Sequence, residues 1–398
     1  MTKSQQAILF INFFSFGLMI PVFNLILLAK GASLQTLPLL LAVYSITVLC
    51  LELPSGILAD LFSRKAVFSL SCGFQFICCI LLIVANHIAV LILAVIFLGL
   101  SRAFSSGSLD ALFIDDALSR QGATCLTKVT SNLAIIEGVA LALGGIAGGI
   151  ITSISGTYLT VLFIRLAFTV MVFILCMVVV RELRTPGTTH KQSLIGHIRD
   201  GKKVVFQTPK FAILIIGVFF IGFLLSSIET YWQSAFINIT NLQNSAWLLG
   251  IITFLGFLAV VAGNRAAQKI MDKYSDKWWS IYIIFRIIFA VSIISFAFQK
   301  NDLGFTLGYS SVYLLLGSCN IVENTLINQM TPTHLRASVL SLNSLFSQIG
   351  GLSASILSGL LIYKLQIIGL WMVSGGLIGI YAIFVLIKKR KKITVSVD

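Results

Sequence analysis

The stretch "ELPSGILADLFSRK" at residues 52–65 begins inside a strongly apolar segment and ends on two adjacent cations, Arg64 and Lys65. It also carries two acids, Glu52 and Asp60. Charge is rare elsewhere, because 58% of the 398 residues are hydrophobic and only 11% are charged. A soluble domain is about half apolar and about a quarter charged, so this composition indicates a protein whose solvent is lipid.

Twelve apolar stretches of the chain are each long enough to cross a hydrocarbon core of about 30 Å. Because an unpaired backbone group in lipid costs several kcal/mol, we expect every stretch to be helical. The expected spans are residues 7–29, 36–60, 66–86, 88–114, 130–153, 157–180, 211–235, 245–268, 278–299, 304–329, 336–362 and 366–387. The predicted fold class is an all-α membrane protein with twelve transmembrane helices.

The longest polar break, residues 181–210, follows the sixth span and carries seven Lys and Arg residues. It divides the chain into two sets of six spans, which are the two halves expected of one transport unit. The predicted organisation is a six-helix bundle at 1–180, a basic cytoplasmic linker at 181–210, and a second six-helix bundle with a short basic tail at 211–398.

The net charge of +14 is distributed unevenly over the two sides of the predicted membrane protein. When connections are assigned alternately, one side holds 22 Lys and Arg residues, and the other holds only Lys30, Lys300 and Lys364. By the positive-inside rule both termini are predicted to be cytoplasmic, in a multi-pass protein of a bacterial-type cell membrane. The "KKRKK" run at 388–392 is expected to meet anionic headgroups rather than nucleic acid.

Residue types that would hold a metal or cofactor are not grouped in this sequence. Six of the seven cysteines lie inside predicted spans without metal-ligand spacing, and the four histidines form no cluster. The chain also has no G-x-x-x-x-G-K-S/T match for a phosphate loop. We therefore expect no metal, no cofactor and no direct ATP hydrolysis.

The opening stretch forms the predicted turn between the second and third spans, and there the sequence resembles the major facilitator superfamily. The superfamily signature reads roughly G-x-x-x-D-R-x-G-R-R/K. Four of its positions are matched, by Gly56, Asp60, Arg64 and Lys65. The sequence departs from the signature at two others, where Leu61 and Ser63 stand in place of Arg and Gly.

This resemblance implies a conformational latch that holds the two halves in the outward-open state. Asp60 would face a helix N-terminus, and Arg64 would pair with an acid at the end of helix four. That acid would be Asp115 or Asp116.

A second resemblance lies in "LGGIAGG" at 143–149, which is similar to the glycine motif associated with antiporters of the superfamily. The motif comprises Gly144, Gly145, Gly148 and Gly149. Glycines spaced four residues apart form a flat stripe on which another helix can pack, a feature common in membrane bundles. Helix four adds Arg102 and "SSGSLDALFIDD" at 105–116, similar to exporters, so the drug:proton antiporter branch is the predicted one.

Ionisable residues inside the spans are the candidates for proton coupling and substrate binding, because each costs about 2.5 to 3.5 kcal/mol at a helix centre and must face protein or water. A structural ion pair is the alternative interpretation for Arg102 and Asp110, and Arg165 and Arg286 are interpreted as partners of the buried acids. Glu52 is more typical of a gate or packing contact. The acids and the further cation considered are Glu52, Arg102, Asp110, Glu137, Glu229 and Glu323.

Helix ten carries a polar stripe in "NIVENTLINQ" at 320–329. Asn320, Glu323, Asn324 and Asn328 fall within about 140° of arc at 100° per residue. This stripe predicts either a site that lines a central cavity or hydrogen-bonded contacts between helices. Asn12 in the first span lies on another face that is part polar and part aromatic.

Together these features predict a secondary transporter and not an enzyme. Two bundles would rock about a central cavity, and buried carboxyl groups would exchange protons for a small amphipathic or lipophilic compound. An importer, or an exporter of one metabolite or lipid, is the alternative within the same fold; a polytopic membrane enzyme is a remote one. The expected partners are the small-molecule substrate, protons and the lipid bilayer, and the functional unit is expected to be a monomer.

Overall fold

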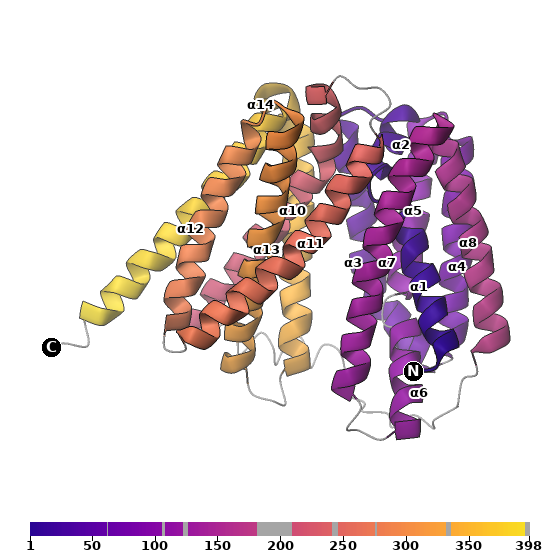
Figure 1. Ribbon diagram of the computed structural model, residues 1–398, viewed down its shortest axis with the longest axis horizontal. Helices are drawn as coiled ribbons and strands as arrows, with labels where there is room; N and C mark the ends of the chain where they lie inside the picture. Colours follow the sequence, from indigo (N-terminus) through magenta and orange to yellow (C-terminus); the bar gives the residue numbers. More distant parts are fainter. Residues whose placement is uncertain are drawn as a thin grey trace. The chain divides into compact units, whose positions relative to one another are not determined.

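The computed structural model describes residues 1–61, 63–105, 108–121, 126–180, 209–240, 246–274, 277–331 and 336–394. Within these ranges the regular structure is helical, which confirms the all-α part of the predicted fold class (Figure 1). The predicted linker falls almost entirely on residues 181–208, which lie outside the described residues.

The helices form two compact units. Unit 1 comprises Met1–Thr189 together with Leu242–Phe254, and unit 2 comprises His190–Asn241 and Leu255–Asp398. The first part of helix α11 therefore clusters with unit 1, whereas the sequence places all of it in the second bundle. The helices that lie wholly in unit 1 are α1 (Lys3–Gly17), α2 (Phe23–Ala29), α3 (Thr36–Leu61), α4 (Arg64–Val84), α5 (Ile88–Ser105), α6 (Leu109–Gln121), α7 (Leu126–Ser155) and α8 (Tyr158–Val179).

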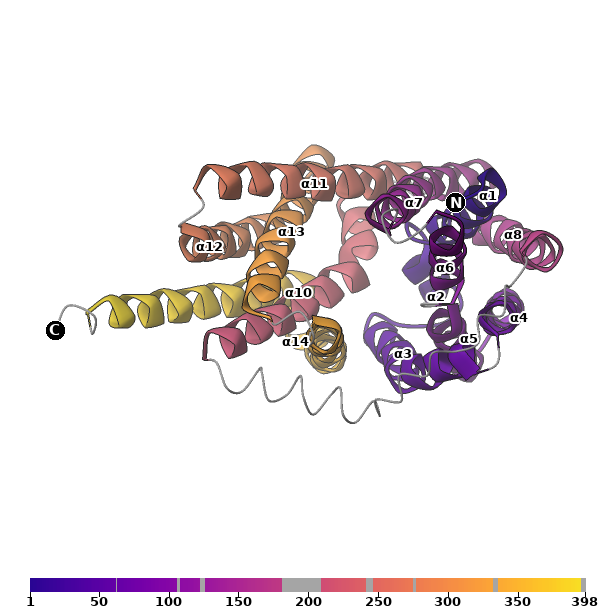
Figure 2. The same ribbon diagram turned by 90° about the horizontal axis from the view of Figure 1, so that it is seen from below.

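Unit 2 is built from helices that pack around α14. Both α10 and α12 pack against α14, and α12 also packs against α13; Figure 2 shows these helices from below. Phe296 lies at the centre of an aromatic core, with ring centroids 4.7 Å from Trp371 and 4.8 Å from Phe305. The helices that lie wholly or partly in unit 2 are α10 (Pro209–Thr240), α11 (Ala246–Lys273), α12 (Trp278–Ala297), α13 (Asp302–Met330) and α14 (Arg336–Thr394).

Nine of the described helices are long and apolar enough to cross a membrane, against twelve predicted spans. The difference has local causes. The first predicted span is broken into α1 and α2 around Pro21, which has no N–H to continue the helical ladder. For the second, the described residues supply one shorter apolar stretch, Thr36–Glu52, within the longer helix α3 (Thr36–Leu61). The last two run together as α14, in which Gln366 has non-helical dihedrals (φ 55°, ψ −178°) and separates two helices.

Large apolar side chains are exposed on the outside of both units. Ile154 in unit 1 is 83% exposed, and Tyr363 and Ile380 in unit 2 are 75% and 68% exposed. Surfaces of this kind are unfavourable in water but need no cover in lipid. The packing therefore agrees with the membrane location that the composition indicates.

Candidate functional site

A group of three charged side chains lies in unit 1, on three different helices. Arg102 lies in the last turn of α5, Asp110 in the first turn of α6, and Glu137 within α7. Arg102 is close enough to both carboxyl groups to interact with them electrostatically, and the two carboxyl groups also interact with each other. The fold thus brings together three residues that the sequence nominates separately.

This cluster holds two carboxyl groups within electrostatic range of one guanidinium group. With both acids ionised one negative charge is left over, and a proton on either carboxyl group makes the cluster neutral. Asp110 and Glu137 are half-buried, and Arg102 is exposed although it lies on a strongly apolar helix. Since a charged side chain is costly against lipid, this face of unit 1 must meet water or protein.

The phenol of Tyr44 on α3 extends the polar interior of unit 1. It lies within electrostatic range of Arg102, Arg165 and Glu52. Glu52 is half-buried and belongs to the same polar region as the cluster. Tyr44 is missing from the candidates drawn from the sequence, because one tyrosine in an apolar helix carries no signal of its own.

Arg165 on α8 is buried, with 4% of its surface exposed, and its partner differs from the expected one. Its Nη2 donates a hydrogen bond to Oε1 of Gln75 at 3.0 Å, and its guanidinium lies 5.0 Å from the ring centroid of Phe16. Its Nε has no hydrogen-bond partner among the described residues. The expectation that Arg165 pairs with an acid is thus corrected: an amide and an aromatic face take that place.

Glu323 on α13 takes part in a buried network in unit 2. Its Oε1 accepts hydrogen bonds from Nη2 of Arg286 at 2.7 Å and from the hydroxyl of Tyr282 at 3.0 Å. The Tyr282 and Tyr381 hydroxyls are 2.7 Å apart, and Tyr381 donates to the carbonyl oxygen of Ile213 at 2.7 Å. Four helices, α10, α12, α13 and α14, are joined in this way.

The network leaves little room for water. The side chains of Arg286 and Glu323 are 0% and 4% exposed. A Cβ atom added to Gly217 on α10 would lie 2.7 Å from Oε1 of Glu323, so the backbone of α10 closes one side of the network. This geometry favours the structural alternative for Glu323, and Arg286 is the partner that the sequence suggests for an acid.

The asparagines of the helix-ten stripe do not share the environment of Glu323. Asn324 is exposed, and Asn320 and Asn328 are half-buried, whereas Glu323 points into unit 2. An exposed amide on a membrane helix is better placed against water or protein than against lipid. Asn12 on α1 is also half-buried.

Glu229 on α10 lies in an aromatic environment. It is half-buried and interacts electrostatically with Tyr309, whose ring centroid is 4.9 Å from that of Trp232. The structure therefore places Glu229 beside aromatic side chains of α10 and α13.

Part of the predicted latch can be placed. Ser63 caps α4 by accepting a hydrogen bond from the backbone N–H of Ala66, which explains a serine where the signature has glycine. The ammonium group of Lys65 donates to the carbonyl oxygens of Met177 and Val180, both at 2.8 Å, and so binds the C-terminal end of α8.

Of the acids predicted to belong to the latch, the structure describes one side chain, that of Asp116. Asp116 accepts hydrogen bonds from Nε2 of Gln5 at 2.6 Å and from Nε of Arg120 at 2.9 Å. The side chains of Asp60 and Asp115 lie outside the described residues. Gly56 lies within α3 with open space beside it, and the pairing of Arg64 stays a prediction.

The four motif glycines of α7 face two different helices in unit 1. Gly144 and Gly148 face the backbone of α1, where an added Cβ would collide with the carbonyl oxygens of Phe14 and Leu18. On the other face, a Cβ on Gly149 would lie 2.5 Å from the carbonyl oxygen of Ala246, and one on Gly145 would lie 3.0 Å from Thr253. Glycine is needed on both faces because backbone meets backbone there.

Comparison with known proteins sets these features in a family. The model of the Major Facilitator Superfamily matches residues 7–355. The chain belongs to this superfamily. Superfamily members are transporters, so the protein is a multi-pass membrane transporter and not an enzyme, as predicted.

Several transporters resemble this chain. An uncharacterised MFS-type transporter of Bacillus subtilis (strain 168), YxaM, is 24% identical over 353 residues, which cover 87% of this chain and 85% of the relative. The crystal structure of the nucleoside transporter NupG has a TM-score of 0.79 and 13% identity, with 96% of this chain and 97% of that chain covered. A bacterial homologue of the human lysosomal transporter Spinster, in an inward-facing and unoccupied conformation, has a TM-score of 0.72 and 12% identity, with 96% and 94% covered. At such identities the solved structures establish the superfamily fold alone.

Proposed function

We propose that this superfamily transporter exports small amphipathic compounds in exchange for protons, by alternating access, in a bacterial cytoplasmic membrane. The observation that carries this proposal is the cluster of Arg102, Asp110 and Glu137. Charged groups on membrane helices must face water or protein rather than lipid. The guanidinium group is exposed and the two carboxyl groups are half-buried, so all three can face a polar space on one side of unit 1. Such a cluster can take up and release a proton as its surroundings change.

The energy available from protons is sufficient for transport. One proton that moves inward through a potential of 100 mV releases about 2.3 kcal/mol. A tenfold concentration gradient requires about 1.4 kcal/mol, so one proton per uncharged substrate supports an outward gradient of more than tenfold. The transporter acts as a monomer in this proposal, because each chain carries the complete cluster.

Glu323 has a structural role in the proposal, and the carboxyl groups of unit 1 carry the proton. Glu323 is held by Arg286 and Tyr282 at hydrogen-bond distances, whereas Asp110 and Glu137 keep partial access. The exposed Asn324 and the half-buried Asn320, Asn328 and Asn12 supply neutral polar groups for the substrate.

A flux measurement in proteoliposomes tests the direction of coupling. The purified protein is reconstituted with pyranine trapped inside as a pH indicator, and an imposed pH gradient drives transport of ethidium, an aromatic cation, or of uridine. We expect ethidium and protons to move in opposite directions. Co-directional movement of uridine and protons identifies the importer alternative and contradicts the export proposal.

A further inference from the structure

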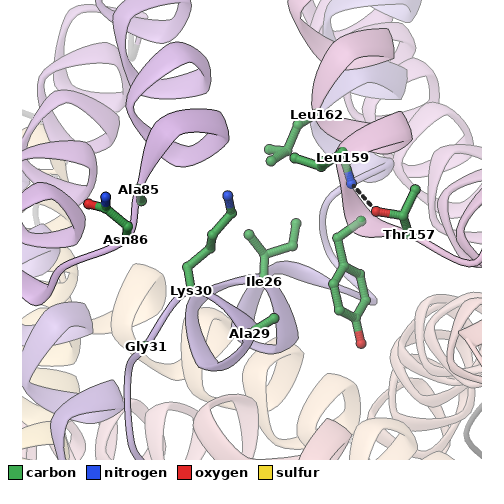
Figure 3. A pocket seen from close by; sticks show the side chains of 10 residues that line it. Ile26, Ala29, Lys30, Gly31, Ala85, Asn86, Thr157, Leu159 and Leu162 are labelled. Atoms are coloured by element: carbon green, nitrogen blue, oxygen red, sulfur yellow. Dashed lines mark hydrogen bonds between the residues drawn. The ribbon is translucent and has the colours of Figure 1, made fainter.

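A pocket of about 510 Å³ lies within unit 1, away from the charged cluster. It is formed by the end of α2, the connection between α4 and α5, and the start of α8. Figure 3 shows the side chain of Lys30 between Asn86 on one side and Thr157 and Leu159 on the other. Its volume falls in the range of small-ligand sites, about 300 to 1,000 Å³.

Lys30 gives this pocket a positive charge that no neighbouring acid balances. The three segments that form the pocket, residues 22–36, 82–92 and 152–164, contain no Asp or Glu. Nζ of Lys30 donates a hydrogen bond to the carbonyl oxygen of Ile83 at 2.6 Å, in the last turn of α4. An ammonium group has three N–H donors, so two remain for a ligand.

The other walls combine hydrogen-bond donors with an apolar surface. Asn86, Thr157 and Tyr158 contribute an amide and two hydroxyl groups, and the Thr157 hydroxyl already accepts from the backbone N–H of Leu159 at 3.3 Å. Ile26 and Leu162 form an apolar wall beside them. A ligand that carries negative charge, accepts hydrogen bonds and has an apolar body would match the charge of Lys30, the polar donors and the apolar wall.

The location narrows the ligand class further. Lys30 is one of three cations on the side that carries few positive charges, which the positive-inside rule places at the outer membrane surface. We propose that this pocket binds a phosphate group, with the phosphate oxygens at Lys30 and Asn86 and any attached chain along Leu159 and Leu162. Phosphate oxygens accept charge-assisted hydrogen bonds from an ammonium group, which are about twice as strong as neutral ones. The phosphate belongs either to an anionic phospholipid headgroup or to a free anion.

Lipid titration of the full-length protein in a neutral detergent tests the proposal. Native mass spectrometry compares phosphatidylglycerol with phosphatidylcholine of the same acyl chains, and a thermal-shift assay measures the effect of inorganic phosphate. We expect phosphatidylglycerol to bind about tenfold more tightly, because the choline cation cancels the phosphate charge of phosphatidylcholine and is repelled by Lys30, whereas phosphatidylglycerol keeps a net negative charge. Lys30→Gln removes this preference and Lys30→Arg keeps it. Lys300→Gln and Lys364→Gln, at exposed lysines of unit 2, are the matched controls and leave the preference unchanged.

Because Lys30 also caps α4, a second variant keeps the test independent of folding. Asn86→Trp fills the pocket at an exposed position and leaves the bond between Lys30 and Ile83 in place. Asn86→Trp is expected to abolish the phosphatidylglycerol preference. If Lys30→Gln does not fold, Asn86→Trp alone tests whether the pocket binds phosphate. Stabilisation by inorganic phosphate that both variants lose, without a lipid preference, identifies a free anion as the source.

Two results overturn the proposal. One is equal binding of both lipids with no stabilisation by phosphate in the parent protein. The other is a lipid preference or a phosphate effect that survives in the Asn86→Trp variant. Neither result depends on the direction of transport or on proton coupling.

Discussion

Replacing Glu323 by Gln tests whether its ion pair with Arg286 holds unit 2 together. The pair is buried, with side chains 0% and 4% exposed, and its N–O distance is 2.7 Å. The substitution leaves the Arg286 charge buried without an acid, which costs about 3 to 5 kcal/mol of unfolding free energy. The hydrogen bond from Tyr282 survives on the amide oxygen, so the loss comes mainly from the charge.

Tryptophan fluorescence is a suitable reporter for this unfolding. Four of the five tryptophans, residues 232, 278, 279 and 371, belong to unit 2. Unfolding is followed in dodecyl maltoside with increasing amounts of dodecyl sulfate, and the parent protein is compared with Glu323→Gln, Arg286→Met and the double variant. The double variant is expected to recover most of the lost stability, because replacing both members of a buried pair is often neutral.

A partly exposed pair serves as the control for this prediction. Arg120 and Asp116 are 2.9 Å apart, with side chains 58% and 10% exposed. Arg120→Gln is expected to change stability by less than about 1 kcal/mol, as is usual for surface pairs. The reasoning is refuted if Glu323→Gln unfolds within about 1 kcal/mol of the parent protein, or if the double variant is less stable than either single variant.

Three further substitutions test local features of the fold. Gln366→Gly is expected to raise the unfolding free energy by about 1 kcal/mol, because glycine adopts φ 55° and ψ −178° without strain; an unchanged or lower denaturation midpoint contradicts this. Gly148→Ala is expected to cost about 1 to 3 kcal/mol through collision with the Leu18 carbonyl oxygen, whereas Gly138→Ala on the same helix meets open space and is neutral or stabilising; equal unfolding midpoints exclude the close approach. Lys65→Gln is expected to lower stability by about 0.3 to 1 kcal/mol by weakening the cap of α8, and a change that is insensitive to salt argues against this charge effect.

Hydropathy predicts where the helices lie because lipid leaves the backbone no other way to satisfy its polar groups. It does not predict where they break. The interruption around Pro21 could be predicted, because proline breaks helices. The interruption at Gln366 could not, because glutamine is an ordinary helix residue. Hydropathy also cannot show that the first part of α11 clusters with unit 1, because that depends on glycines meeting across two helices.

The sequence predicts which residues are candidates for the site, but it does not predict which of them contact one another. The polar stripe of helix ten marks Glu323 and Asn324 together, yet the rotation of α13 buries the first and exposes the second. Similarly, nothing in the sequence links Arg165 to Gln75, which lies 90 residues away. The partners depend on how helices rotate and pack, and the hydrophobic pattern of one helix leaves those angles open.

Transport by carboxyl variants of unit 1 tests the central claim most directly. Ethidium flux in proteoliposomes is measured with and without a pH gradient for the parent protein, Asp110→Asn, Glu137→Gln, and Asp302→Asn as a control at an exposed acid of unit 2. At least one of the first two variants is predicted to keep exchange of ethidium at equal pH but to lose the acceleration by the gradient, while Asp302→Asn behaves like the parent. If Asp110→Asn and Glu137→Gln both respond to the gradient as the parent does, these carboxyl groups do not carry the proton.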